Sequence, residues 1–394
     1  MKNFFYLVLF FIFVPTNNLS ASINFGTNNM NMKLDMIVRT DYEINNSDDN
    51  TLRIAGSNGY AMNTNKELEA MEFKVKTARI KAMGKIDEYI EYYLDWNVNK
   101  IFSFSETANS GTVQNINLLD SIDEVWGQYR LVSNFYLNVG KVFSGVGGTE
   151  LIQQPQEVYL YSLGGTEFSD IAYRPGIIAG VNFYGQELYL AIVNINDNTY
   201  NKKMPAAGIV YMGDFLDGAI LPILSFHRSQ TEKQELGGLS GSSVAPLKVN
   251  YYYSAGVGLK MWEEQLFLEV NWLKNIYKDK SSESKSDTTQ SIIGEAKINH
   301  RAIGFVRPLA KYELSKKTIA DSDYLDRMAY VVGLEFFPRI QRGKLDYGLN
   351  IHAIYTLYAD TYKREVPSTT QFGAKVNGKK ITTSQILLGL TLEI

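Results

Sequence analysis

Apolar and polar residues alternate one by one along many short stretches of the chain. From Met30 to Val38, apolar side chains take every second position, and polar side chains take almost all of the positions between them. Successive side chains of a β-strand point to opposite faces of the sheet. The pattern therefore predicts a strand with one apolar face and one polar face.

The same alternation predicts further strands along the rest of the chain. A change of phase inside the strand expected at 71–82 predicts a β-bulge near Thr77. Gly84-Lys85 is predicted to form a tight turn into the strand expected at 86–98. The strands are expected at 71–82, 86–98, 125–131, 135–139, 171–184, 187–195, 206–214, 219–228, 248–261, 265–277, 302–314, 324–337, 344–358 and 382–394.

The connections between these strands alternate in length. Short joints such as 184–186 and 263–264 alternate with long polar stretches such as 230–246 and 279–290. Short turns on one side and long loops on the other are typical of an antiparallel transmembrane β-barrel. At roughly 23 residues for each strand and its connection, the length fits about 16 strands, with 14 to 18 left open.

The first residues predict export from the cytoplasm. Lys2 precedes an apolar run from Phe4 to Val14, and small residues follow at 20–22. This order is that of a secretory signal peptide covering residues 1–21, with cleavage after Ala21 and with Ser20 or Ser22 as alternative sites. An uncleaved anchor or a buried strand is the alternative. Residues 22–394 are then expected to form one barrel domain, because no linker or repeat divides them.

The last residues resemble the C-terminal strand that the barrel-assembly machinery recognises. Leu390, Leu392 and Ile394 alternate with other residues up to the terminus. Most such strands end in an aromatic residue, which Ile394 is not, so a soluble edge strand is the alternative. Barrel-assembly machinery and outer-membrane lipid are the partners that this interpretation implies.

Composition excludes several other classes of protein. The chain has no cysteine, which rules out disulfides, thiolate metal sites and a cysteine nucleophile. Its hydrophobic fraction is 45%, yet the mean hydropathy is only −0.17, as expected when apolar and polar residues alternate in a barrel wall. The formal net charge of −3 makes nucleic acid an unsuitable partner.

Candidate sites for catalysis or metal binding are weak. Ser225 and His227 share a strand face, but no orienting acid or oxyanion hole accompanies them. The three histidines are scattered, and the alternating carboxylates of 321–326 fit a solvated hairpin better than a Ca²⁺ site. We therefore expect no enzyme, no cofactor and no bound metal.

Several segments, in order, resemble the phosphate-selective porin O and P family. They are 77–82 with Gly84-Lys85, 124–129 with 137–143, 174–194, 307–313 and 331–338. The resemblance implies a homotrimer of barrels with about 16 strands, in which the third long loop, here 143–169, folds inward and narrows the pore. In phosphate-selective members, arginines and a lysine at the constriction hold the anion.

The predicted inward loop departs from that pattern. Residues 143–169 contain no Lys or Arg, so phosphate selectivity is not inherited from the resemblance, and we expect only weak ion selectivity. Charged residues on or near the strands and in the loop are candidates to line the pore, with solvated rim charges as the alternative. These pore-lining candidates are Arg79, Lys81, Arg130, Arg174, Arg228, Arg307, Arg327, Glu150, Glu157 and Glu167.

Seven aromatic residues are candidates for girdles at the two membrane interfaces, with packing in the core or the lumen as the alternative. They are Tyr92, Trp96, Trp126, Trp262, Trp272, Tyr355 and Tyr358.

The sequence thus predicts an outer-membrane porin for small hydrophilic solutes or ions. A structural or adhesive barrel with a plugged lumen and surface-exposed loops shares the wall features. A channel for apolar compounds needs an apolar N-terminal hatch, and residues 24–31 are too short and polar to form one.

Overall fold

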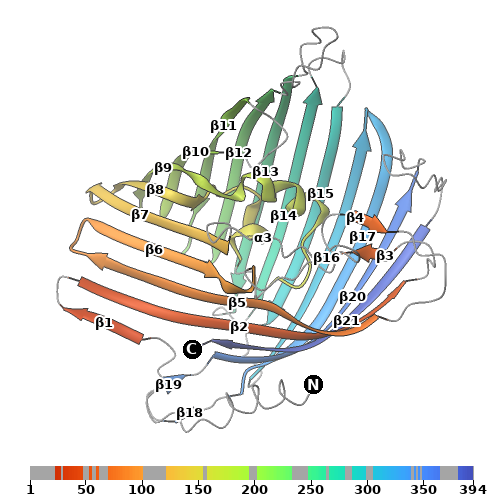
Figure 1. Cartoon of the computed structure of the whole chain (residues 1–394), viewed down its shortest axis with the longest axis horizontal. Helices are drawn as coiled ribbons and strands as arrows, with labels where there is room; N and C mark the ends of the chain where they lie inside the picture. The colour runs from red at the N-terminus through yellow and green to blue at the C-terminus, as the bar shows by residue number, and fades with distance from the viewer. Residues whose placement is uncertain are drawn as a thin grey trace, which may run out of the picture.

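The wall of the molecule is a closed antiparallel β-barrel of 16 strands (Figure 1). The structure is a computed structural model that describes residues 23–27, 30–47, 53–55, 59–61, 70–100, 121–153, 158–194, 202–232, 247–262, 266–279, 286–298, 305–338, 341–342, 345–346, 348–363 and 380–393. The predicted signal peptide lies outside these residues.

Each strand pairs with its neighbours in sequence order, and the last strand pairs with the first to close the barrel. The wall strands are β2 (Met30–Ser47), β5 (Ala70–Ile86), β6 (Ile90–Asn97), β7 (Ile122–Val132), β8 (Phe135–Phe143), β9 (Tyr173–Phe183), β10 (Gln186–Val193), β11 (Lys202–Gly213), β12 (Ile220–Glu232), β13 (Leu247–Met261), β14 (Leu266–Asp279), β15 (Ser286–Ile298), β16 (Val306–Ile319), β17 (Ser322–Phe336), β20 (Gly348–Tyr362) and β21 (Lys380–Glu393).

The remaining elements lie at the ends or inside the barrel. The short strand β1 (Ile23–Thr27) pairs with the start of β2, on the edge that β21 occupies further along. Two small hairpins, two helices and a 3-10 turn complete the described part: β3 (Arg53–Ala55) with β4 (Gly59–Ala61), β18 (Gln341–Arg342) with β19 (Leu345–Asp346), α3 (Gly148–Ile152), α4 (Leu163–Ala172) and η1 (Val98–Lys100). No described helix is long and apolar enough to cross a membrane.

The alternation seen in the sequence separates an apolar outer face from a polar inner face. Large apolar side chains such as Phe73, Leu190 and Leu334 are 74%, 57% and 55% exposed. Polar side chains on the opposite face, such as Glu313 and Glu335, are fully buried. This inside-out distribution is the one expected for a wall that contacts lipid, since lipid-facing and lumen-facing residues alternate along each strand.

The predicted bulge is present, but the predicted tight turn is wrong. Arg39 pairs with Thr77 and Thr40 with Val75, which leaves Lys76 as the extra residue. Strand β5, however, continues through Gly84 to Ile86, and the turn falls at 87–89, where the Asp87 carboxylate accepts hydrogen bonds from two backbone N–H groups. Gly84 is needed for packing instead, because a Cβ there would overlap the Asn31 backbone carbonyl and the Tyr92 hydroxyl.

Strand β15 is absent from the predicted strands. Its inner face carries Thr289, Ser291 and then the buried Ile293, while Ile292 beside it is exposed on the outer face. Two adjacent apolar residues blur the two-residue period that identifies strands. The inner Ile293 belongs to an apolar cluster that includes residues of the inward loop, and this partner is invisible in a local pattern.

Candidate functional site: the inward loop and the barrel interior

The described parts of the connection between β8 and β9, residues 144–153 and 158–172, fold into the barrel and are called the inward loop here. Its two ends meet, because the Ser144 N–H donates to the Ala172 carbonyl over 2.7 Å. Gly145, with φ +75°, lies so close to Tyr189 that a Cβ would overlap its hydroxyl. His227 of β12 hydrogen-bonds the Ser144 carbonyl at 3.0 Å. The predicted inward fold of this loop is therefore confirmed.

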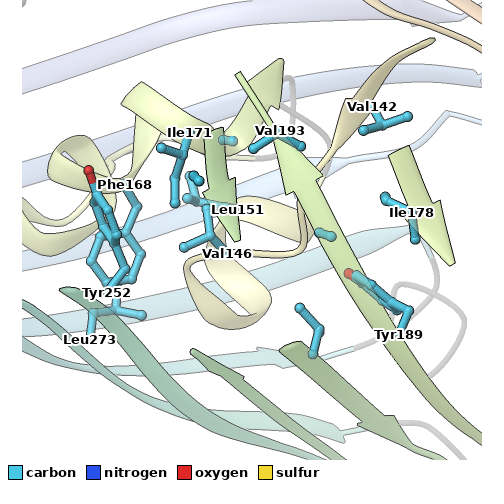
Figure 2. Close-up of a cluster of buried hydrophobic side chains, with 14 of the residues drawn as sticks. Val142, Val146, Leu151, Phe168, Ile171, Ile178, Tyr189, Val193, Tyr252 and Leu273 are labelled. Carbon is cyan, nitrogen blue, oxygen red and sulfur yellow. The ribbon is translucent and has the colours of Figure 1, made fainter. Parts of the chain in front are cut away.

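Apolar side chains hold one side of the inward loop against the wall (Figure 2). Val146, Leu151 and Phe168 are buried, and the Phe168 ring meets Tyr252 of β13 edge-on at 5.5 Å between centroids. Leu273 of β14 completes this contact. Burial of apolar area is the main force that fixes a segment against a surface, so the loop is packed on β13 and β14 rather than suspended in the lumen.

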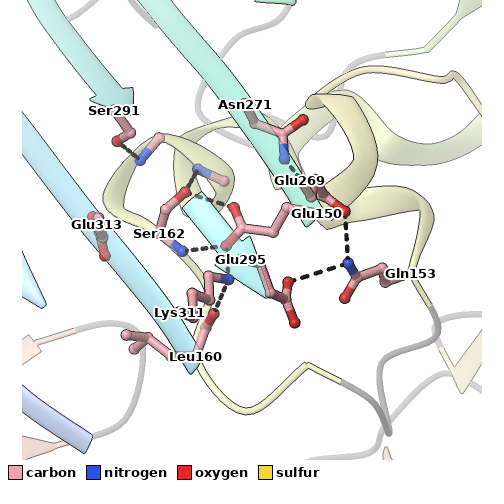
Figure 3. Close-up of polar contacts among 12 residues, drawn as sticks. Glu150, Gln153, Leu160, Ser162, Glu269, Asn271, Ser291, Glu295, Lys311 and Glu313 are labelled. Atoms are coloured by element: carbon pink, nitrogen blue, oxygen red, sulfur yellow. Dashed lines mark hydrogen bonds and ion pairs between the residues drawn. The ribbon is translucent and has the colours of Figure 1, made fainter. Parts of the chain in front are cut away.

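A buried carboxylate, Glu150 of α3, joins the two helical parts of the inward loop to the wall (Figure 3). It accepts hydrogen bonds from the N–H and the hydroxyl of Ser162, at 2.8 and 2.6 Å. Ser162 is also the N-cap of α4, where it accepts from the Gly165 N–H at 2.9 Å. Lys311 of β16 donates to Glu150 at 2.6 Å and to the Leu160 carbonyl at 2.7 Å.

Further carboxylates and hydroxyls on the wall bind the backbone of the inward loop. Glu313 of β16 accepts from the Leu163 N–H, and Ser291 of β15 accepts from the Gly164 N–H, both at 2.8 Å. These are the free N–H groups expected at the start of a helix. Glu167 pairs with Lys317 at 2.7 Å. The start of α4 is thus fixed to two adjacent strands.

The far end of the inward loop reaches the opposite wall through Tyr159. Its hydroxyl donates to Glu335 of β17 at 2.8 Å, and Arg39 of β2 lies 4.6 Å over its ring. Burial raises the pKa of Tyr159 above its ordinary range, so the hydroxyl stays a donor. Asp41, beside Arg39, accepts from Arg39 and His352. The loop therefore spans the interior from β12 to β2.

Most of the basic candidates face the interior, and carboxylates accompany them. Arg79 bridges Asp95 and Asp123, with Lys81 4.0 Å from Asp95. Three further arginines pair with acidic residues of neighbouring strands, and Arg174 shares the inner face of β9 with Ile178. The three pairs are Arg130 with Glu91, Arg307 with Glu335, and Arg327 with Asp360.

Arg228 differs from the other basic candidates, because it faces outward and the prediction that it lines the pore is wrong. Ser225, His227 and Ser229 of β12 are buried on the inner face, whereas Leu224, Phe226 and Arg228 are exposed on the outer one. Arg228 hydrogen-bonds Gln230 there, so we remove it from the pore-lining set. Glu157 lies outside the described residues. Glu150 and Glu167 lie in the inward loop with the partners given above.

The aromatic candidates divide in the same way. Tyr92, Trp96, Trp272 and Tyr355 belong to outward positions of their strands, and Trp262 lies in an exposed turn, 69% accessible. Trp126 and Tyr358 face inward, so the prediction that they belong to the aromatic girdles is wrong. Trp126 packs against the interior cluster and stacks on Tyr93 at 5.4 Å, and the Tyr358 hydroxyl donates to Gln385.

The residues that sequence reasoning missed are chiefly the wall partners of the inward loop: Arg39, Asp41, Glu269, Glu295, Lys311, Glu313 and Glu335. Their strand phase marks them as inward, but nothing local shows that the loop reaches them. Gln153, for instance, donates to both Glu269 and Glu295, more than 100 residues away in the sequence.

The weak candidates for other chemistry each have a structural partner. The Ser225 hydroxyl bonds Ser254 at 2.5 Å, while His227 bonds the loop backbone. Asp321 occupies a two-residue turn and accepts from Ser286, and Asp323 pairs with Lys316. Within the described residues, no three side chains of His, Asp or Glu are grouped to hold a metal ion.

Comparison with known proteins identifies this barrel. The family model of phosphate-selective porin O and P matches residues 50–212, a stretch that contains the inward loop. The chain is an outer-membrane porin. No curated protein matches this porin in sequence. The match bears out the resemblance predicted from the sequence, and it supports an outer-membrane channel for passive diffusion of small solutes.

Solved porins share the fold of this one. The outer membrane channel DcaP of Acinetobacter baumannii has a TM-score of 0.63 at 10% identity, covering 94% of this chain and 99% of that one. The anion-selective porin of Comamonas acidovorans gives 0.59 at 11%, covering 93% and 100%. OmpT of Vibrio cholerae, known in a trimer form, gives 0.59 at 9%, covering 93% and 100%.

Proposed function

We propose that this porin passes small hydrophilic solutes and ions with weak selectivity, and that it does not hold phosphate. One observation carries the proposal: Arg79, Arg307, Arg327 and Lys311, which face the interior, are all engaged by carboxylates. A phosphate site needs cationic donors that are available to the anion. Paired charges of both signs give instead a polar passage with little net field.

Reversal potentials across a planar bilayer test this proposal. In a tenfold gradient of potassium chloride, a weakly selective pore gives a reversal potential near zero compared with the limit of roughly 59 mV for a perfectly selective one. Replacing chloride by phosphate should lower the conductance only as far as the mobility of phosphate requires. A strongly anion-selective potential, or block of the chloride current by micromolar phosphate, contradicts the proposal.

A structural or adhesive barrel with a plugged lumen is the second candidate. It is favoured by the packing of the inward loop, whose Phe168 and Ile171 are fully buried inside the barrel. A plugged barrel gives no conductance at any salt concentration, whereas the proposed pore gives discrete steps. The presence of steps therefore separates the two functions.

The assembled state is also part of the proposal. We infer a homotrimer in the outer membrane, supported by the trimer form of the similar Vibrio cholerae OmpT. The exposed apolar side chains of the outer face, such as Val270 and Ile351, fit lipid as the surrounding partner. Export through a signal peptide cleaved after Ala21, and recognition of β21 by the barrel-assembly machinery, complete the route to that membrane.

A further inference from the structure

A pocket of about 170 Å³ lies on the inner face of strands β7 to β11, next to the start of the inward loop. Its chemistry is set by Glu124, Trp126, Tyr136, Asn138, Glu187 and Tyr189, and we call it the inner pocket. A single water needs only about 10–15 Å³, so the pocket has room for a small organic molecule.

The inner pocket carries several hydrogen-bond acceptors, among them two carboxylates. The Trp126 indole N–H donates to one Glu124 oxygen at 3.3 Å, and the Tyr136 hydroxyl donates to one Glu187 oxygen. These two donors are therefore used by the pocket's own residues. The Asn138 Oδ1 is buried and has no hydrogen-bond partner within the described residues. One oxygen of each carboxylate therefore remains for a ligand, beside the Asn138 Oδ1.

The two carboxylates also lack counter-ions. Within the described residues, neither Glu124 nor Glu187 forms an ion pair, whereas many other interior carboxylates, such as Asp95 and Glu335, do. The nearby cations belong to other groups, since Arg79 bridges Asp95 and Asp123, and Arg130 pairs with Glu91. Buried carboxylates without a cation are costly, so the pocket favours a ligand that brings positive charge.

The walls of the inner pocket are aromatic and firmly held. Tyr136 lies against Gly180, where a Cβ would overlap its ring, and the Tyr189 hydroxyl lies against Gly145. The Tyr189 side chain, with Val142 and Ile178 near it, is seen in Figure 2. The faces of aromatic rings attract cations, most strongly where water is excluded.

We propose that the inner pocket binds small organic ammonium ions. The N–H donors of a primary ammonium group meet the free oxygens of Glu124, Glu187 and Asn138, and its alkyl chain contacts the rings. Tyr136 and Glu187 each lie two residues after a short turn, at Ser133-Asn134 and Tyr184-Gly185. Short turns are periplasmic in barrels of this class, so the pocket lies on the periplasmic side of the inward loop.

Calorimetry on the purified full chain in detergent tests the site. Titration with n-butylammonium chloride should give saturable binding, and n-butanol, which has the same shape without the charge, should give none. The variant Glu124→Gln/Glu187→Gln keeps the acceptors for Trp126 and Tyr136 but removes both charges, and it should weaken butylammonium binding roughly tenfold or more. Glu88→Gln, the same change in an exposed turn at this end of the barrel, should leave binding unchanged.

Other outcomes overturn the proposal. Equal affinity in wild type and the double variant, equal binding of butanol, or full competition by calcium chloride would each show that no organic-cation site exists here. If the double variant does not fold, Glu187→Gln alone is measured. Binding does not depend on conduction, so a protein that binds butylammonium but carries no potassium current contradicts only the proposed porin function.

Discussion

Lys311 and Glu150 form the buried ion pair that joins the inward loop to the wall. Both side chains are less than 10% exposed, and both make further hydrogen bonds to the loop. Removing one partner of a buried pair leaves an uncompensated charge and costs about 3–5 kcal/mol, which is much more than an exposed pair contributes. The position of the loop thus depends strongly on a single lysine of β16.

The variant Lys311→Met should therefore loosen the inward loop and raise both the single-channel conductance and its noise in a planar bilayer. Lys316→Met is the matched control, because Lys316 lies on the same strand but pairs with Asp323 in solvent at about half exposure. Unchanged conductance in Lys311→Met, or an equal change in the control, would show that this pair does not position the loop.

The tryptophans offer a second test at the residue scale. Trp272 lies on the outer face beside the exposed Val270, whereas Trp126 stacks on Tyr93 inside the barrel. In variants that keep only one tryptophan, brominated lipid should quench the fluorescence of Trp272 and leave that of Trp126 nearly unchanged. Strong quenching of Trp126 would place it at the lipid surface and contradict the fold described for β7.

The phase of the strands predicted most residue orientations, and its failures have physical causes. The Val125-Gly127-Tyr129 face of β7 already excludes Trp126 from lipid, but assignment by residue type placed it in a girdle. In β12, apolar residues occupy both faces around Leu224, so the phase of Arg228 is ambiguous in the sequence. Partners such as Lys311 for Glu150 depend on the tertiary fold and have no local signal.

The inward loop has closed ends, which makes it separable from the strands that carry it. Ser144 and Ala172 are hydrogen-bonded to each other, and β8 pairs with β9 directly below them, from Phe143 with Tyr173 onward. The loop is therefore not needed to hold these strands in register. Its helices instead fill the interior against β13, β14 and β15.

Replacement of residues 147–169 by a short Gly-Ser turn should accordingly leave a folded barrel with a several-fold higher conductance. Folding is checked by the heat-dependent mobility of the barrel on a denaturing gel, and conductance in a planar bilayer. A folded variant with the conductance of the wild type would show that the loop does not narrow the pore. Loss of folding would show that the loop supports the wall.

Strands were predictable where one face meets lipid and the other meets water. The pattern failed for β15, whose inner Ile293 packs in the interior cluster. It also failed for the end of β5, where Gly84 does not form a turn but leaves space for the Tyr92 side chain. Both failures come from side chains that pack across strands. The family resemblance predicted the inward loop, whereas no local sequence pattern predicted its two helices.

At the scale of the whole molecule, export and assembly precede function. The order of charged, apolar and small residues before position 22 predicts a cleaved signal peptide. Protein recovered from outer membranes should begin at Ser22 when sequenced from its N-terminus, with neighbouring starts at Ala21 or Ile23 consistent with the alternative sites. A protein that begins at Met1 would contradict the predicted processing.

The closed barrel with a polar interior is the central claim, and conductance tests it most directly. Purified protein added to a planar bilayer in 1 M potassium chloride should insert in discrete steps, with groups of three if the trimer is correct, and should show a reversal potential close to zero in a salt gradient. A protein that inserts without any current would be a plugged structural barrel, and strong anion selectivity with block by phosphate would contradict the paired interior charges.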